Sequence, residues 1–142
     1  MKTLLLSLAC ALVTAASLQA VSNDEVAARK VAYEVAGAFT NDGFKMRDGC
    51  WAGKFELKKP QLIQVNLYAG NQYWFSASAT EPAKKIGVSV YDETGKQMTT
   101  EGYDNGERAA AGFAPSNSGQ YFVSIDLVEG EQGTFCLVYS YK

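Results

Sequence analysis

Residues 61–80 have the sequence QLIQVNLYAGNQYWFSASAT, in which apolar and polar side chains alternate on both sides of a Gly-Asn pair. A period of two places successive side chains on opposite faces of a β-strand. The alternation directs one set of apolar side chains to a shared face: Ile63, Val65, Leu67, Tyr73, Phe75, Ala77 and Ala79. Gly70 and Asn71 are typical of a turn, so we expect two strands joined as a hairpin.

The same alternation recurs in later segments of the chain. Their apolar members are Ile86, Val88 and Val90; Ala109, Ala111 and Phe113; Tyr121, Val123, Ile125 and Leu127; and Phe135, Leu137, Tyr139 and Tyr141. Turns rich in Gly, Asn and Asp separate them, with a weaker strand expected at residues 97–100 and a loop at 103–106. With a short strand at residues 53–57, we expect a mainly β protein: an antiparallel, jelly-roll-like β-sandwich of about seven or eight strands across residues 44–142.

Residues 21–43 precede this domain and carry a different period. Ser22 and Glu25 have the Ser-x-x-Glu spacing of a capping box, which marks the start of a helix. An apolar stripe follows at helical spacing: Ala28, Val31, Ala32, Val35, Ala36 and Phe39. Because the other side of this amphipathic helix carries both signs of charge, we expect it to pack on the sandwich, in preference to lying on a membrane surface.

Residues 1–20 have the pattern of a cleaved signal peptide. Lys2 provides the positive start, residues 4–13 an apolar run, and residues 17–20 a small-residue cleavage region that ends at Ala20. Two alternatives fit less well: a membrane anchor would need a longer apolar run, and lipid attachment at Cys10 would need a different preceding sequence. We therefore expect a secreted or periplasmic protein, with no stable membrane insertion after signal cleavage.

The composition of the 142 residues excludes several classes of function. There is no histidine, so Ser-His-Asp and Cys-His nucleophiles and histidine-based metal sites are excluded. The net charge of −2 argues against nucleic acid as a partner. We expect a protein that is not an enzyme and that needs no cofactor, apart from a calcium ion considered below.

Two cysteines remain once Cys10 is removed with the signal peptide. Cys50 and Cys136 would then form an even pair in an oxidising compartment, which predicts one disulfide bond. They are not in the C-x-x-C arrangement of redox-active dithiols. We expect the bond to fasten the segment after the helix to the last strand.

The polar face of residues 61–80 is the best candidate for binding. If the apolar set points inward, Gln64, Asn66, Tyr68 and Trp74 point outward, and aromatic rings among amides suit a polysaccharide or an extracellular protein. The alternative is that the helix covers this face. Three apolar residues of the helix would then rest on Tyr68 and Trp74: Val31, Val35 and Phe39.

Acidic residues offer two further interpretations. Asp104, Asn105 and Glu107 could supply oxygen ligands to Ca²⁺, although the spacing lacks a full EF-hand loop and a solvated loop is the alternative. Paired carboxylates could also hydrolyse glycosides, and the candidates are Asp92, Glu93, Glu101, Asp104 and Glu107. Both clusters fall in turn-like sequence, where acidic side chains are usually solvated.

Four segments together follow a pattern found in a known family: residues 67–75 (LYAGNQYWF), 86–95 (IGVSVYDETG), 111–115 (AGFAP) and 118–125 (SGQYFVSI). On these motifs, residues 53–142 bear a resemblance to the bacterial pre-peptidase C-terminal domain. This resemblance implies a jelly-roll-like sandwich of the kind usually appended to secreted peptidases and related enzymes, with a role in secretion, targeting or substrate binding. The chain departs from that pattern, because it leaves no room for a peptidase and adds the helix and the cysteine pair.

These observations support three hypotheses of function. The first is an exported, non-enzymatic binding or adhesion module that recognises a polysaccharide or an extracellular protein. The second is a secreted or periplasmic inhibitor or accessory protein of a hydrolase, which would use long loops such as residues 99–108. The third is a small hydrolase based on carboxylates.

Overall fold

The computed structural model describes residues 22–39, 42–56 and 59–142, so the predicted signal peptide lies outside the described residues. One helix precedes the strands: α1 (Asn23–Gly37). The strands are β1 (Lys45–Met46), β2 (Trp51–Lys54), β3 (Gln61–Leu67), β4 (Tyr73–Ala79), β5 (Ala83–Asp92), β6 (Glu101–Asn105), β7 (Arg108–Phe113), β8 (Gly119–Gly130) and β9 (Thr134–Tyr141). Within these ranges, no helix is both long enough and apolar enough to cross a membrane.

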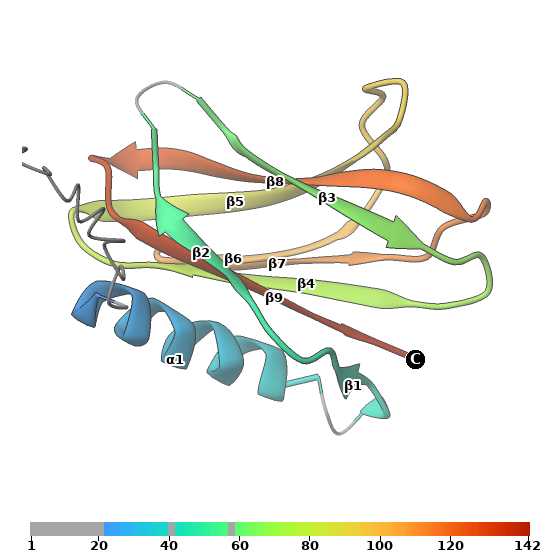
Figure 1. Ribbon diagram of the computed structural model, residues 1–142, viewed down its shortest axis with the longest axis horizontal. Helices are drawn as coiled ribbons and strands as arrows, with labels where there is room; N and C mark the ends of the chain where they lie inside the picture. Colours follow the sequence, from blue (N-terminus) through green and yellow to red (C-terminus); the bar gives the residue numbers. More distant parts are fainter. Residues whose placement is uncertain (1–21, 40–41, 57–58) are drawn as a thin grey trace, which may run out of the picture.

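The strands form two antiparallel sheets that face each other. The six-stranded sheet has the order β1-β9-β4-β7-β6, with β2 also paired to β9, and the three-stranded sheet has the order β3-β8-β5. Figure 1 shows the two layers, with α1 lying against the outer face of the six-stranded sheet. The predicted fold class, a mainly β antiparallel sandwich with one N-terminal helix, is confirmed.

The core lies between the sheets and is built from the alternating apolar side chains. Ile63 and Val65 of β3 face Phe75 of β4 across it, and all three are buried. The central strand β8 contributes Val123 and Ile125, both fully buried. Because alternate side chains of each strand enter this core, the remaining side chains must point to one of two outer faces.

The predicted hairpin of residues 61–80 is wrong. β3 pairs with β8, whereas β4 pairs with β7 and β9, so the chain crosses from one sheet to the other between Leu67 and Tyr73. Gly70 makes the turn with φ of +91°, a conformation that favours glycine. The alternation identifies which side of a strand is buried, but two strands with matching patterns can face the same core from opposite sheets.

The strand assignment near residue 100 also needs correction. Residues 101–105 form β6, where a loop was expected, and residues 97–100 contribute only an isolated bridge between Tyr91 and Gln97. All five residues of β6 are exposed because β6 is the edge strand of its sheet and no residue of it enters the core. An edge strand without a buried side leaves no alternation to detect.

Helix α1 begins where the sequence predicts. The Ser22 hydroxyl accepts a hydrogen bond of 3.2 Å from the Glu25 backbone N–H, as an N-cap should. The helix ends at Gly37, earlier than the predicted range of 21–43. Its buried residues are Ala28, Ala32, Val35 and Ala36, which cover the outward side chains of β4 and β9: Ser76, Ser78, Cys136, Val138 and Ser140.

Small side chains on both surfaces bring the helix backbone close to the sheet. The Ser78 hydroxyl donates a hydrogen bond to the backbone carbonyl of Ala28, which ties β4 to α1. The hydroxyls of Ser76 and Ser140 are buried in the same interface and have no hydrogen-bond partner within the described residues. Removing a hydroxyl from water costs free energy, and here no hydrogen bond offsets that cost. These serines are therefore expected to weaken the interface.

Ser76 and Ser78 lie two residues apart on the same face of β4. Truncating them to alanine should therefore change the free energy of unfolding in opposite directions. Ser76→Ala removes an unpaired hydroxyl and is expected to raise the free energy of unfolding by about 1 kcal/mol. Ser78→Ala removes a hydrogen bond and is expected to lower it by about 1 kcal/mol. Urea denaturation followed by circular dichroism measures both values, and equal effects of the two variants would contradict this account.

Candidate functional site

The structure separates the four residues of the predicted binding face. Gln64 and Asn66 lie on the outer side of β3, and Tyr68 follows that strand directly; all three are exposed. Trp74 lies on β4, in the opposite sheet, and points to the outer face that α1 covers. These residues therefore do not form one surface, because the predicted hairpin that would have joined them does not exist.

Trp74 is half-buried and is covered by Phe39, one of the three residues that the alternative interpretation named. The ring of Phe39 stacks on the Trp74 indole, with centroids 4.2 Å apart and planes 6° from parallel. Gly112 of β7 leaves room for the indole, since a Cβ added there would lie 2.9 Å from the ring. Tyr68, by contrast, is 62% exposed on the other side of the sandwich.

The outer face of the three-stranded sheet presents a different set of residues. Strand register places Gln64, Phe122 and Tyr91 side by side across β3, β8 and β5. One flanking row places Asn66 opposite Gln120. In the other, Leu62 and Ser89 lie on either side of Ser124, which is buried and donates a hydrogen bond to Asp126 Oδ1 at 2.7 Å. We call this surface the β8 face and define it by six residues: Gln64, Asn66, Ser89, Tyr91, Gln120 and Phe122.

Alternation fixes the orientation of these side chains. Val90 and Val123 are fully buried in the core, so their neighbours Tyr91 and Phe122 point the other way. Both rings are half-buried, which leaves part of each accessible at the surface. Aromatic rings next to amide and hydroxyl groups can stack on the apolar side of a flat ligand while hydrogen bonding to its polar edge.

Sequence reasoning missed Phe122 and Tyr91. Both occupy the outward positions of strands whose inward members were identified correctly: Val123 and Ile125 in β8, and Val88 and Val90 in β5. The available signal was an aromatic residue at a position where alternation predicts a polar one. In residues 61–80 the same signal pointed to Trp74, which the structure places in the opposite sheet.

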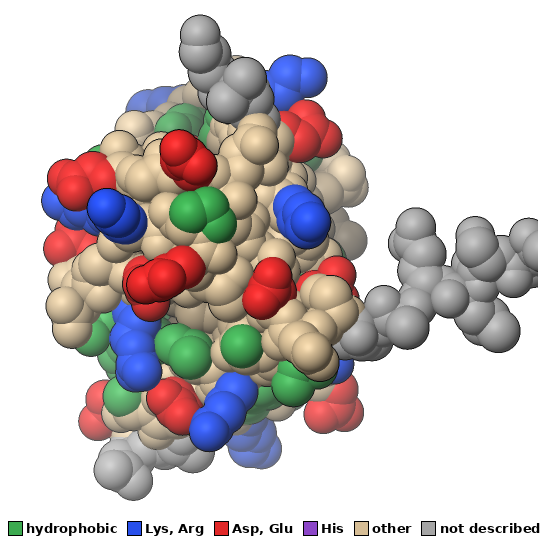
Figure 2. Space-filling view, turned by 90° about the vertical axis from the view of Figure 1, so that its left-hand side faces the viewer, with side chains coloured by type: hydrophobic (Ala, Val, Ile, Leu, Met, Phe, Trp, Pro, Cys, Tyr) green, Lys and Arg blue, Asp and Glu red, His purple; other side chains and the backbone are tan. Residues whose placement is uncertain are grey.

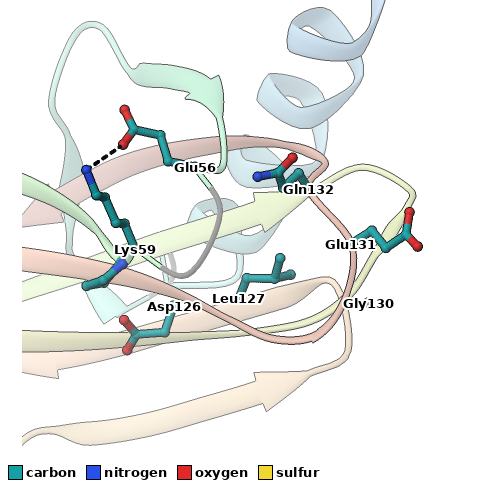
Figure 3. A pocket seen from close by; sticks show the side chains of 8 residues that line it. Glu56, Lys59, Asp126, Leu127, Gly130, Glu131 and Gln132 are labelled. Carbon is teal, nitrogen blue, oxygen red and sulfur yellow. Dashed lines mark ion pairs between the residues drawn. The ribbon is translucent and has the colours of Figure 1, made fainter.

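Several hollows lie around the sandwich. One of about 710 Å³ is shown in Figure 3 and lies between the segment before β3 and the end of β8. Lys59 and Glu56 form an exposed ion pair there, with 3.7 Å between Nζ and Oε2. Another hollow, of about 380 Å³, is lined in part by Glu101 and by Trp74, whose ring stacks on Phe39.

A third hollow adjoins the β8 face, and we call it the loop hollow. It has a volume of about 380 Å³. The turn after β5, the loop between β7 and β8, and Gln120 all contribute to its lining: Asp92, Glu93, Thr94, Lys96, Met98, Phe113, Ala114, Ser116, Asn117, Ser118, Gly119, Gln120 and Tyr121. Gln120 belongs to both the hollow and the face, so the two are continuous.

Asp92 has a structural task in this hollow. Its Oδ1 accepts hydrogen bonds from the Thr94 hydroxyl at 2.6 Å, the Thr94 N–H at 2.9 Å and the Lys96 N–H at 3.0 Å. The bond from the Thr94 hydroxyl contributes most to holding the pKa of the Asp92 carboxyl below its usual value. A general acid of a glycosidase needs a raised pKa, which is the opposite direction.

The residues predicted to bind calcium do not converge. Asp104 and Asn105 are consecutive in β6, so their side chains point to opposite faces of the strand. Glu107 follows in the turn to β7 and is exposed. Across the described ranges, there is no group of three or more acidic, cysteine or histidine residues that could hold a metal ion.

The predicted disulfide bond is not present in the structure. Cys50 directly precedes β2, whose Ala52 is in register with Cys136 of β9, and both cysteines are free thiols. Burial raises the pKa of the Cys136 thiol to about 12, and the neighbouring Cys50 thiol, which is hydrogen-bonded to it, adds to the rise. Strand pairing brings the thiols together, but closing the bond needs an oxidant, which strand pairing does not supply.

Comparison with known proteins adds no family to this description. No protein-family model matches the chain, and no curated protein matches its sequence. At the end of the sandwich where α1 begins, acidic and basic side chains are interspersed, so this view shows no patch of a single sign (Figure 2).

The stacking of Phe39 on Trp74 gives a spectroscopic prediction. Phe39→Ala should expose the indole and move its fluorescence emission to longer wavelength, since the ring loses its apolar cover. Trp51→Phe in the background leaves Trp74 as the sole tryptophan. Val26→Ala, at a residue of α1 that is 56% exposed, is the control and should leave the emission unchanged. An unshifted spectrum in the Phe39 variant would contradict the stacked arrangement.

Proposed function

We propose that this protein is an exported, non-enzymatic binding module that recognises a polysaccharide through the β8 face. The observation that carries the proposal is the row of Gln64, Phe122 and Tyr91 across the three strands. A sugar ring has an apolar side and a rim of hydroxyls, so it suits a surface that offers aromatic rings beside amides.

The position of α1 supports this choice of surface. The helix lies on the six-stranded sheet, on the far side of the molecule from the β8 face (Figure 1). Phe122 and Tyr91 therefore lie on the sheet that α1 leaves uncovered; Trp74, which is half-buried to the same degree, has one side of its ring stacked on Phe39. Rigid strands also hold the row in place, which lowers the ordering cost of binding.

Two sequence features support an exported location. The pattern of residues 1–20 is that of a signal peptide, and polysaccharides are typical partners outside the cell. The resemblance of residues 53–142 to the pre-peptidase C-terminal domain favours the same interpretation, since such domains accompany secreted enzymes. We propose this kinship on the motif residues alone, which fall at the end of β3, in β4, β5, β7 and β8, and in the turns next to these strands.

An extracellular protein is the second candidate partner, and one observation favours it. Leu62 and Val128 point outward from β3 and β8 and are 60% and 54% exposed. Such residues at the border of the β8 face could form part of a protein interface. A protein partner of this kind includes a secreted hydrolase, for which the module would act as an inhibitor or accessory protein.

The proposal predicts the effect of truncating the central ring. Phe122→Ala should lower the affinity for polysaccharide at least tenfold, since aromatic contacts contribute most to such interfaces. Affinity gel electrophoresis with soluble neutral glucans, xylans and mannans measures this. Tyr103→Ala is the matched control, because Tyr103 is 43% exposed on β6 of the other sheet. Equal affinities of wild type and Phe122→Ala, or binding to a partner protein alone, would contradict the proposal.

We further propose that the two thiols close to a disulfide after export. Cys50 is the more accessible, so its thiolate would attack a disulfide oxidant and release one of the oxidant's thiols. Cys136 would then attack Cys50 Sγ in the mixed disulfide, which forms the Cys50–Cys136 bond and releases the oxidant's second thiol. Two thiols are oxidised to one disulfide, and the oxidant's disulfide is reduced to two thiols.

Oxidation should be visible in both mass and stability. Protein isolated from the exported fraction should be lighter by two hydrogens than after reduction. Its stability should exceed that of the reduced form by up to about 4 to 5 kcal/mol for a loop of this length. Cys50→Ser should show neither difference. Two alkylatable thiols in native exported protein would contradict the bond.

A further inference from the structure

The loop hollow continues the β8 face at the end where β8 begins. Gln120 and Phe122 are two residues apart on the same outer side of β8, a separation of about 7 Å along the strand. Gln120 also lines the hollow, together with Ser116 and Asn117 from the preceding loop. The hollow therefore lies within one sugar unit of the end of a ligand that covers Phe122.

Hydrogen bonding divides the residues of the hollow into two groups. Some maintain the fold: Asp92 closes its turn, the Ser118 hydroxyl accepts from the Ala69 N–H at 2.8 Å, and the Tyr121 hydroxyl donates to the Asn117 carbonyl at 2.7 Å. Among the described residues, the side chains of Ser116, Asn117 and Gln120 make no such bond. Their donors and acceptors are therefore available to a ligand.

The charges of the hollow favour an uncharged ligand. Glu93 and Lys96 carry opposite charges on the same turn, and the side chains between this turn and Phe122 are neutral amides and hydroxyls. The carboxylates of Asp92 and Glu93 would repel an anionic sugar. Asp92 Oδ1 already accepts three hydrogen bonds in its own turn, which leaves Glu93 and Lys96 as one charge of each sign. Amide groups instead match the hydroxyls of a neutral sugar as both donors and acceptors.

From these observations we infer that the ligand is a neutral oligosaccharide of at least two sugar units, with one unit over Phe122 and Tyr91 and the next in the loop hollow. This inference rests on the proposed function. A volume of about 380 Å³ lies at the lower end of small-molecule sites, which span about 300 to 1,000 Å³, and so suits one end of a chain. Asn117 and Gln120 are then specificity residues for chain length.

The test measures affinity against chain length by isothermal titration calorimetry. The probes are glucan, xylan, mannan and N-acetylated chitin oligosaccharides of one to six units. Wild type should bind the disaccharide or trisaccharide of the preferred series at least tenfold more tightly than the monosaccharide. Asn117→Ala and Gln120→Ala should lose about fivefold to tenfold in affinity for these, with little change for the monosaccharide, since each removes hydrogen bonds to the second unit.

Gln132→Ala is the matched control, because Gln132 is an exposed amide that lines the hollow of about 710 Å³ at the other end of β8. This variant should bind all probes as wild type does. A flat dependence on chain length, or unchanged trisaccharide binding by both loop-hollow variants, would overturn this inference while Phe122→Ala still tests the proposed function. Phe122→Ala binding as tightly as wild type would overturn the proposed function itself, and with it this inference. Failure of every probe to bind would also overturn both.

Discussion

The shared core between the two sheets is the constraint on which the rest of the structure depends. Phe75 and Leu137 from one sheet and Val123 and Ile125 from the other are fully buried there. Because a strand has only two sides, every residue placed in this core directs its neighbours to an outer face. The positions of the helix, the thiols and the β8 face all follow from that division.

The helix covers one of the two outer faces and leaves the other at the surface, and the side chains of the two faces explain this difference. The face of the six-stranded sheet carries Ser76, Ser78 and Cys136, which are small enough for a helix rich in alanine to approach closely. The face of the three-stranded sheet carries Phe122, Tyr91 and amides, which leave rings and hydrogen-bonding groups at the surface. One face is thereby covered by α1, and the other keeps its side chains at the surface.

Much of the fold could be predicted because it depends on local periods. The inward residues of β3, β4, β7, β8 and β9, and the start of α1 at Ser22, follow from alternation and capping. β6 could not be predicted, because an exposed edge strand buries nothing. The candidate site was predicted only in part: Gln64 and Asn66 lie on the β8 face, whereas Trp74 lies in the other sheet and Phe122 was missed.

The sequence by itself determined which side of the core-facing strands β3, β4, β5, β7, β8 and β9 is apolar, where the helix begins and that histidine chemistry is absent. These properties depend on residue type and on spacings of a few positions. Only the tertiary structure decided that β3 and β4 lie in different sheets, that Phe39 covers Trp74, and that Gln64, Phe122 and Tyr91 form one row. Strand partners far apart in the sequence are chosen by packing across the common core, and alternation with a period of two is the same for every pairing.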